Sequence, residues 1–230
     1  VRAGLRARLR RMEGGYRLQL DDQGFTLIHD RGARERLEWA QIARLQATPD
    51  FYKVACARLA AEAQGDEAIA RRCFEFVRDE IRHSWDYRQN PVTCRASDVL
   101  RHGTGYCYAK SHLLAALLRA NGVPTGLCYQ RLSVGDTGAP YCLHGLNAVW
   151  LKDQQQWRRL DARGNKPGVD AQFLPDGPEQ LAFTVHPQFG EVDYPHIFAE
   201  PDPGVVALLL APIPPTLDQV LPRLPQGLAP

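Results

Sequence analysis

The sequence predicts an α+β fold in which one buried helix packs against antiparallel strands. The stretch from Cys107 to Ala120 is apolar on nearly every side, which is typical of a helix inside a core. Asn121-Gly122 is predicted to end this helix, because glycine readily adopts the left-handed conformation that follows a helix. Two later segments, His144 to Leu151 and Trp157 to Asp161, are predicted to be strands joined by a polar turn.

The residues before this core predict a small β appendage at positions 16–46. Tyr16 to Leu20 alternates apolar and polar residues, and Phe25 to Ile28 is predicted to be the returning strand. The turn signal Asp21 to Gly24 lies between them. Glu38 to Ile42 is either a third strand or a short helix.

Two helices are predicted between the appendage and the Cys107 helix. Phe51 to Ala63 suits the first, and Asp66 is the expected N-cap of the second. Apolar residues recur at helical spacing in the second helix and predict its core face. These positions are Ile69, Cys73, Phe76, Val77 and Ile81.

Less regular structure is predicted beyond the Cys107 helix. Leu127 to Leu132 is predicted to be a strand and Ser133 to Pro140 a glycine-containing loop. Because loops often carry specificity and motion, we expect both in this one. A short helix is expected near residues 204–210, before an extended tail rich in proline.

The composition limits the classes of partner. Lys+Arg 28 against Asp+Glu 26 gives a formal charge of +2, which is too balanced to indicate nucleic-acid binding. No apolar run approaches the roughly 20 residues that span a bilayer, so no membrane segment is expected. The arginine-rich start lacks the apolar stretch of a secretory signal. We therefore expect the six cysteines to be reduced thiols in the cytoplasm.

Three side chains point to covalent chemistry. Cys107, His144 and Asp161 offer a thiol, an imidazole and a carboxylate, which together can provide a nucleophile, its base and the group that orients the base. Each alone is more often structural, as a buried cysteine, a strand histidine or a turn aspartate. Their order and local sequences favour acyl-group chemistry.

The position of Cys107 suits a nucleophile. It follows the turn Gly103-Thr104-Gly105 and begins the predicted helix. The unpaired N–H groups and the positive end of the helix dipole favour a thiolate, which is the nucleophilic form. The glycines allow a sharp turn and leave backbone N–H groups free to stabilise an oxyanion.

Whether His144 and Asp161 can meet depends on the number of residues that connect the two strands. They are an odd number of residues apart, and side chains alternate between the two faces of a strand. With a two- or four-residue connection both would project from one face of the sheet, with Asp161 opposite or diagonal to His144. An odd-length connection would break this parity.

The sequence resembles the bacterial transglutaminase-like family of the papain-like cysteine-enzyme superfamily. The matching motifs are GTGYCYAKS at 103–111, HGLNAV at 144–149 and LDARGN at 160–165. The resemblance implies a papain-like core, in which a Cys-bearing buried helix packs on an antiparallel sheet that carries His and Asp. It also divides the chain into a basic extension with the β appendage (1–46), a transglutaminase-like catalytic domain (47–200) and a proline-rich tail (201–230).

The resemblance also implies roles and a reaction. Cys107 would be the nucleophile, His144 the general base and acid, and Asp161 the group that orients the imidazolium. Attack on an amide or thioester carbonyl would form an acyl-thioester enzyme, and water or an amine would accept the acyl group. We favour peptidase or amidase hydrolysis over transfer to an amine. The expected partner is a peptide, a protein or a small amide or thioester; no cofactor and no calcium loop are expected.

Other residues near these motifs are weaker candidates for the substrate or oxyanion site. Relatives complete the oxyanion site with an upstream side chain, for which Trp85 and Tyr87 are the candidates here, with ordinary core aromatics as the alternative interpretation. The backbone N–H of Cys107 is the stronger candidate for an oxyanion donor. Each of the remaining candidates either shapes the substrate site or only pairs locally. They are Tyr106, Lys110, Ser111, Arg163 and Asn165.

Other interpretations stay open at this point. A catalytically silent transglutaminase-like binding module would have no reactive thiol. A Cys128–Cys142 disulfide is another alternative. A metal site would have to draw on residues whose spacing does not match familiar zinc motifs. These are Cys107, His112, Cys128, Cys142 and His144.

Overall fold

The computed structural model describes residues 16–21, 24–29, 34–38, 63–135, 137–211, 217–220, 223 and 225–228. The chain divides into two compact units, Val1–Arg58 and Leu59–Pro230. The boundary predicted between residues 46 and 47 lies outside the described residues, as does the predicted helix from residue 51 up to residue 62.

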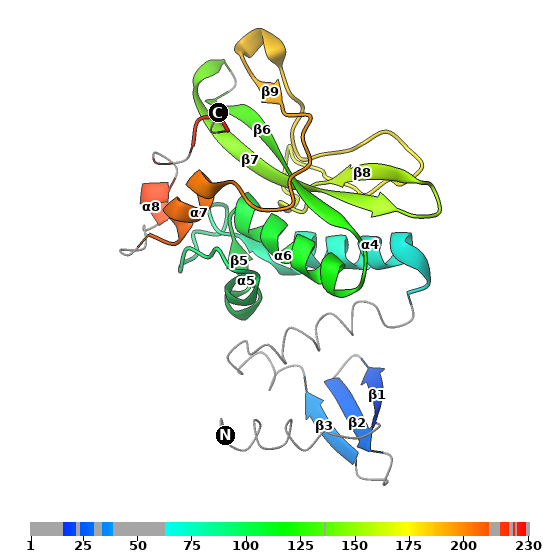
Figure 1. The fold of residues 1–230 in the computed structure, drawn as a ribbon. Coiled ribbons are helices and arrows are strands. Elements are labelled where there is room, and N and C mark those ends of the chain that lie inside the picture. Colours follow the sequence, from blue (N-terminus) through cyan, green and yellow to red (C-terminus); the bar gives the residue numbers. More distant parts are fainter. Residues whose placement is uncertain are drawn as a thin grey trace. The chain divides into compact units, whose positions relative to one another are not determined.

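The first unit contains a three-stranded antiparallel sheet (Figure 1). Strands β1 (Tyr16–Asp21), β2 (Gly24–His29) and β3 (Arg34–Glu38) follow one another in sequence order. The first two strands were predicted from their alternation. The third lies earlier than expected, because β2 pairs with the charged segment at 34–38, which has no apolar alternation to reveal it.

The second unit has two layers. Figure 1 shows helix α6 (Cys107–Ala120) lying against a sheet of order β8-β7-β6-β9, with helix α4 (Gly65–Glu75) on the same side. All neighbouring strands are antiparallel: β6 (Thr125–Gly135), β7 (Gly138–Leu151), β8 (Gln156–Leu160) and β9 (Val192–Asp193). The predicted α+β, papain-like architecture is therefore confirmed.

Helix α6 is the centre of this unit. Its apolar pattern predicted burial, and nearly every side chain is buried, including those of Cys107 and Lys110. The helix ends at Ala120, and Gly122 follows with a φ of +74°, as a left-handed helix stop requires. Strand β7 approaches α6 closely at Gly145, where a Cβ atom would lie only 2.9 Å from Cδ1 of Tyr108.

Helix α4 (Gly65–Glu75) continues into a π-helical turn at Phe76–Glu80. The helix begins at Gly65 with Gln64 before it, so Asp66 lies in the first turn and is not the N-cap. The predicted Cys73, Val77 and Ile81 are buried, whereas Ile69 and Phe76 are half-buried and Phe74 is buried instead. The buried face consists of Ala70, Cys73, Phe74 and Val77, at positions i, i+3, i+4 and i+7, so it passes through Ala70 and Phe74 instead of Ile69 and Phe76.

A short parallel ribbon connects the π-turn to helix α6. Strand β4 (Arg82–His83) pairs with β5 (Thr104–Gly105), which follows helix α5 (Ala96–His102) and immediately precedes α6. Backbone hydrogen bonds run from Arg82 N to Gly103 O (2.9 Å) and from Ser84 N to Gly105 O (3.1 Å).

The prediction of a loop at residues 133–140 is wrong. Strand β6 continues to Gly135 and β7 begins at Gly138, so the two strands meet in a tight hairpin. Gly138 has a φ of +109°, a conformation that glycine adopts readily and that suits the turn. The glycine marks the position of the turn, but nothing in the sequence shows how far the two strands extend on either side of it.

The C-terminal residues agree in part with prediction. Helix α7 (Pro203–Leu209) lies where a short helix was expected, and Asp202 Oδ1 caps it by accepting from Val205 N at 2.9 Å. A further short helix, α8 (Leu217–Val220), interrupts the predicted extended tail. Among the described helices, none has the length and apolar character to cross a membrane.

Candidate active site

Cys107 lies at the first residue of α6, directly after the β5 strand. Tyr106 precedes it in an extended conformation, so the free N–H groups of the first helical turn begin at the thiol. At Gly105 a Cβ atom would lie 3.1 Å from Ala109 Cβ and 3.2 Å from Thr93 Oγ1. The glycine therefore allows the ribbon and the helix to come close together. Cys107 remains 8% exposed.

His144 and Asp161 form a buried pair on the sheet. Nε2 of His144 donates to Oδ2 of Asp161 at 2.7 Å. Residues 152–155 join β7 to β8, and Leu151 pairs with Gln156. This even-length connection satisfies the parity condition. Asn147 pairs with Leu160, so if the same register continues by one residue, Asp161 lies diagonal to His144.

The carboxylate of Asp161 is held ionised. Besides His144, it accepts from the backbone N–H of Arg163 at 3.2 Å and from that of Ala182 at 3.0 Å. Burial alone would raise the pKa of Asp161, but the His144 imidazolium and these hydrogen bonds outweigh it and lower the pKa.

The imidazole of His144 is held protonated. Burial opposes its charge, but the Asp161 carboxylate and the Cys107 sulfur outweigh burial and raise the pKa of His144 to about 10. Both groups also hydrogen-bond to the ring. Since Nε2 faces Asp161, Nδ1 is left for the thiol. Phe183 packs edge-on against the imidazole ring, at 5.1 Å between centroids.

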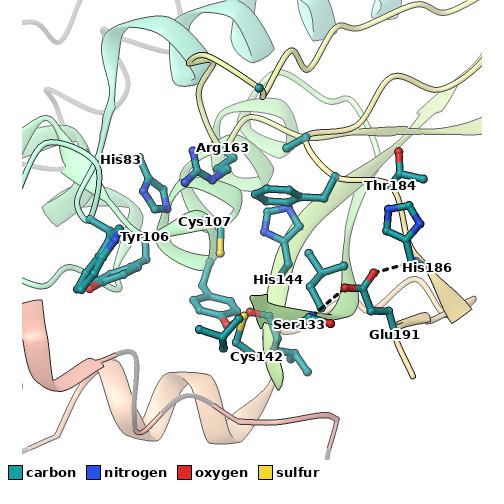
Figure 2. A pocket seen from close by; sticks show the side chains of 18 of the residues that line it. His83, Tyr106, Cys107, Ser133, Cys142, His144, Arg163, Thr184, His186 and Glu191 are labelled. Atoms are coloured by element: carbon teal, nitrogen blue, oxygen red, sulfur yellow. Dashed lines mark hydrogen bonds between the residues drawn. The ribbon is translucent and has the colours of Figure 1, made fainter. Parts of the chain in front are cut away.

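A cleft of about 740 Å³ opens over Cys107 and His144. Figure 2 shows the thiol and the imidazole projecting toward it. Its walls are largely apolar, from Leu132, Leu143, Phe183 and Phe189. At one end, Glu191 accepts from Ser133 N at 2.9 Å and from His186 N at 2.8 Å, which ties the segment before β9 to strand β6 (Figure 2).

Three of the weaker candidates line this cleft: Trp85, Tyr106 and Arg163. The Arg163 guanidinium makes a two-point ion pair with Asp86, from Nη1 to Oδ2 at 2.6 Å and from Nη2 to Oδ1 at 3.1 Å. Arg163 is almost fully buried and already paired, so its role at the cleft is to hold the wall in place.

The other candidates lie away from the cleft. Tyr87 is 57% exposed and, with Asn165, lines a separate cavity of about 140 Å³. Ser111 Oγ donates back to Tyr108 O at 2.7 Å. Lys110 is fully buried, and its Nζ donates to the carbonyls of Arg78, at 3.3 Å, and Ile81. Burial, reinforced by Arg163, lowers the pKa of Lys110 to about 7.

The metal and disulfide alternatives do not agree with the side-chain arrangement. His112 Nδ1 lies 3.0 Å from the carbonyl of Cys94, and His144 is bonded to Asp161. Within residues 63–135 and 137–211, no three His, Cys, Asp or Glu side chains gather in the manner of metal ligands. Cys128 and Cys142 are both free thiols.

Sequence reasoning missed several residues of the cleft. His83, Phe183 and Glu191 all line it. The segment that carries Phe183 lies between β8 and β9 and is mostly irregular, so no periodicity marks it. His83 lies on a strand of only two residues, which is too short to produce a pattern.

Comparison with known proteins places this site in a family. The family model for the Transglutaminase-like superfamily matches residues 54–162. No curated protein sequence matches the chain.

Several solved structures are distantly similar to the chain. A candidate cysteine protease from Cytophaga hutchinsonii is 15% identical with a TM-score of 0.41, over 51% of this chain and 38% of that protein. The periplasmic domain of TgpA from Pseudomonas aeruginosa is 19% identical with a TM-score of 0.39, over 65% of each chain. A protein described as a TGase is 15% identical with a TM-score of 0.38, over 81% of this chain and 53% of that one.

The match thus covers less than half of the Cytophaga protein. The family assignment rests on the matched sequence, which contains Cys107, His144 and Asp161 in order. Residues 54–162, the core of this chain, are similar to the Transglutaminase-like superfamily, and this similarity supports a cysteine-based catalytic domain.

Proposed function

We propose that the protein is a cysteine acyl-transfer enzyme that acts on amide or thioester substrates with Cys107, His144 and Asp161 as its triad. The observation that carries this proposal is the thiol at the start of α6 beside a buried imidazolium–carboxylate pair. A buried His144 cation beside the sulfur stabilises the thiolate form that such chemistry needs.

The proposed reaction has two halves. The Cys107 thiolate attacks the carbonyl carbon, the new C–S bond forms, and the C–N or C–S bond to the leaving group breaks. The His144 imidazolium gives its proton to the leaving amine or thiol, and an acyl-thioester enzyme remains. Water or an amine then attacks the thioester while His144 takes up its proton, and the thiolate leaves.

Hydrolysis is the favoured second half. Water needs no binding pocket of its own, whereas transfer needs a site that concentrates an amine. The cleft is mostly apolar, and its Glu191 carboxylate already accepts two backbone hydrogen bonds. The acyl donor is therefore a peptide or small amide or thioester with an apolar group beside the reacting carbonyl.

Alkylation by iodoacetamide tests whether the thiol is activated. The rate at each cysteine would be followed against pH by peptide mass spectrometry. We expect Cys107 to react faster near neutral pH than the other cysteines, and His144→Ala to abolish this advantage. Cys142 is an internal control in the same cleft, because burial raises its pKa to about 12. Equal rates at the two residues would favour the silent binding module.

Acylation by p-nitrophenyl acetate tests the transfer chemistry. We expect a burst of p-nitrophenolate that is absent from Cys107→Ala, with an acetyl group on Cys107 in the trapped enzyme. Continued turnover in water alone supports hydrolysis. Turnover that requires an added primary amine would instead assign the transglutaminase-type reaction.

A further inference from the structure

A second imidazole lies beside the thiol. His83 lines the same cleft as Cys107 and is 7% exposed. Figure 2 shows His83 and His144 on opposite sides of Cys107. In the proposed reaction the leaving group departs toward His144, which gives it a proton. The acyl group is then the part of the substrate that extends to the other side of the thiol, where His83 lies.

The backbone holds His83 in a fixed relation to the thiol. His83 is paired with Gly105 in the parallel ribbon of β4 and β5, and Gly105 is two residues before Cys107. Backbone hydrogen bonds close the ribbon on either side of His83. The Tyr106 ring packs edge-on against the imidazole, at 5.7 Å between centroids. The imidazole therefore has a set position relative to the sulfur before a substrate binds.

The carboxylate of Asp86 favours a proton on Nδ1 of His83. Oδ2 of Asp86 lies 3.5 Å from Nδ1, and the two side chains are 15% and 8% exposed. Arg163 and Lys166 donate to the same carboxylate, at 2.6 and 2.7 Å, and keep it ionised. An ionised carboxylate attracts an N–H and repels a nitrogen lone pair. The favoured tautomer of His83 therefore carries its proton on Nδ1.

The ring of His83 is neutral, so its other nitrogen is a hydrogen-bond acceptor. Burial, reinforced by the Arg163 cation, holds the pKa of His83 well below its ordinary value, although Asp86 opposes this. The Lys110 and His144 side chains act in the same direction as Arg163. With the single proton on Nδ1, Nε2 keeps its lone pair. No described residue donates a hydrogen bond to this nitrogen.

Other acceptors at the cleft are already occupied. The carbonyl of Leu143, directly before His144, accepts from the Tyr108 hydroxyl. The carboxylate of Glu191 accepts from two backbone N–H groups. A substrate N–H that enters a mostly apolar cleft without an acceptor loses its hydrogen bond to water, which is costly. His83 offers such a group a partner beside the thiol.

We propose that Nε2 of His83 accepts a hydrogen bond from an amide N–H on the acyl side of the substrate, so that the enzyme selects peptide-type acyl donors. In these donors the amide N–H is attached to the carbon next to the reacting carbonyl, whereas simple alkanoyl donors lack it. This inference rests on the proposed acyl-transfer function and narrows its substrate class. His83 gives and takes no proton, since the bond-making steps remain with Cys107 and His144.

A pair of matched substrates tests this hydrogen bond. The p-nitrophenyl esters of N-acetylglycine and levulinic acid have the same length and both carry a second carbonyl, but a CH₂ group replaces the N–H in the levulinyl ester. Each acylation rate at Cys107 is divided by the rate of the same ester with a small thiol in solution, which removes differences in intrinsic reactivity. We expect the wild type to prefer the N-acetylglycyl ester about tenfold after this correction.

Variants at His83 show whether the preference comes from this side chain. His83→Met and His83→Gln form a matched pair, because the two side chains have similar length and the glutamine amide oxygen is the better acceptor. We expect His83→Met to lose the preference and His83→Gln to keep part of it. His102→Met, at an exposed histidine of α5, should keep the wild-type ratio. If His83→Met does not fold, His83→Phe replaces it, since phenylalanine keeps a ring but accepts nothing.

The tautomer is tested without any substrate. Nitrogen-15 chemical shifts separate the Nδ1–H, Nε2–H and imidazolium forms of a histidine ring, and the signals missing from His83→Gln belong to His83. We expect the Nδ1–H form near neutral pH. An Nε2–H or a charged ring would overturn the inference, because neither can accept a hydrogen bond at Nε2.

The kinetic outcomes separate the role of His83 from the proposed function. Equal corrected rates in the wild type, or a preference that survives in His83→Met, refute the role of His83 and leave the acyl-transfer function intact. A fall in both rates of His83→Met with an unchanged ratio shows that His83 supports the thiol and not the substrate. If neither ester acylates Cys107 in the wild type, the proposed function itself fails.

Discussion

Arg163 joins two sides of the cleft through its contact with Asp86. Its guanidinium forms two hydrogen bonds to that carboxylate, while its backbone N–H donates to Asp161. One residue thus connects the carboxylate behind His144 with the carboxylate beside His83. The wall of the cleft and the His144–Asp161 pair are therefore positioned by the same short segment.

Asp86→Asn should destabilise the fold. The Arg163 and Lys166 cations overcome the effect of burial and lower the pKa of Asp86 to about 2. Because the folded-state pKa lies below the ordinary value of 3.8, the stabilisation is complete above about pH 4 and is lost as the pH falls toward 2. We expect a loss of roughly 2 kcal/mol in urea denaturation at neutral pH.

The loss should shrink in acid, where the wild-type carboxylate is also neutral. Asp79→Asn is the matched control, since Asp79 pairs with Arg78 at the surface and its removal should cost less than about 1 kcal/mol. Equal losses in the two variants, or a loss from Asp86→Asn that does not depend on pH, would show that the buried pair contributes no electrostatic stability.

Asp161→Asn should remove the activation of the thiol while keeping the shape of the site. Without the carboxylate, the largest contribution that raises the pKa of His144 is gone. We expect p-nitrophenyl acetate acylation to fall roughly a thousandfold, and alkylation of Cys107 near neutral pH to slow as well. Asp176→Asn, an exposed aspartate that accepts from Gln154, should change neither rate.

The same variant has a signature in stability. The folded-state pKa of His144 is about 10, above its ordinary value of 6.5. Protonation therefore stabilises the fold fully below about pH 6.5, and this contribution is lost as the pH rises toward 10. The difference in unfolding free energy between wild type and Asp161→Asn should be larger near pH 6 than near pH 10. A difference that grows with pH would contradict the imidazolium assignment.

Gly145→Ala should disturb the contact between helix and sheet next to His144. The added methyl group would lie 2.9 Å from Cδ1 and 3.2 Å from Cα of Tyr108, closer than such atoms pack. We expect a loss of about 1–3 kcal/mol in thermal or urea unfolding, together with slower acylation as His144 moves away from Cys107.

Gly135→Ala provides the comparison, because a Cβ atom there meets nothing within 4 Å. It lies on the neighbouring strand and should leave both quantities unchanged. If the two alanine variants behave alike, strand flexibility and not close packing explains the effect.

The parts predicted well from the sequence are those governed by local patterns. The bounds of α6 followed from an apolar stretch and a glycine stop, and both are properties of adjacent residues. The meeting of His144 with Asp161 followed from strand parity, once the connection proved to have even length. Both predictions used only the regular spacing of side chains along a helix or a strand.

The parts that were missed depend on contacts between distant segments. Asp86 and Arg163 are 77 residues apart. The spacing of apolar residues within a helix or strand gives no information on a contact between two residues in separate, irregular segments. His83 depends on a two-residue parallel ribbon. The glycines at 133–140 predict a loop, because glycine is common in loops. In the structure the strands continue through this segment, and the pairing of β6 with β7 shifts its register between Ser133 and Gly135.

The division of the proposed triad between two layers has a consequence for the stage of folding at which the proposed reactivity would arise. His144 and Asp161 are 17 residues apart and belong to a single hairpin, so their pairing needs only local chain closure. Cys107 belongs to the helix and meets them only when α6 has packed against the sheet. Under the proposed function, rapid alkylation of Cys107 is therefore expected only once α6 has packed against the sheet, which would make it a chemical reporter of completed tertiary packing.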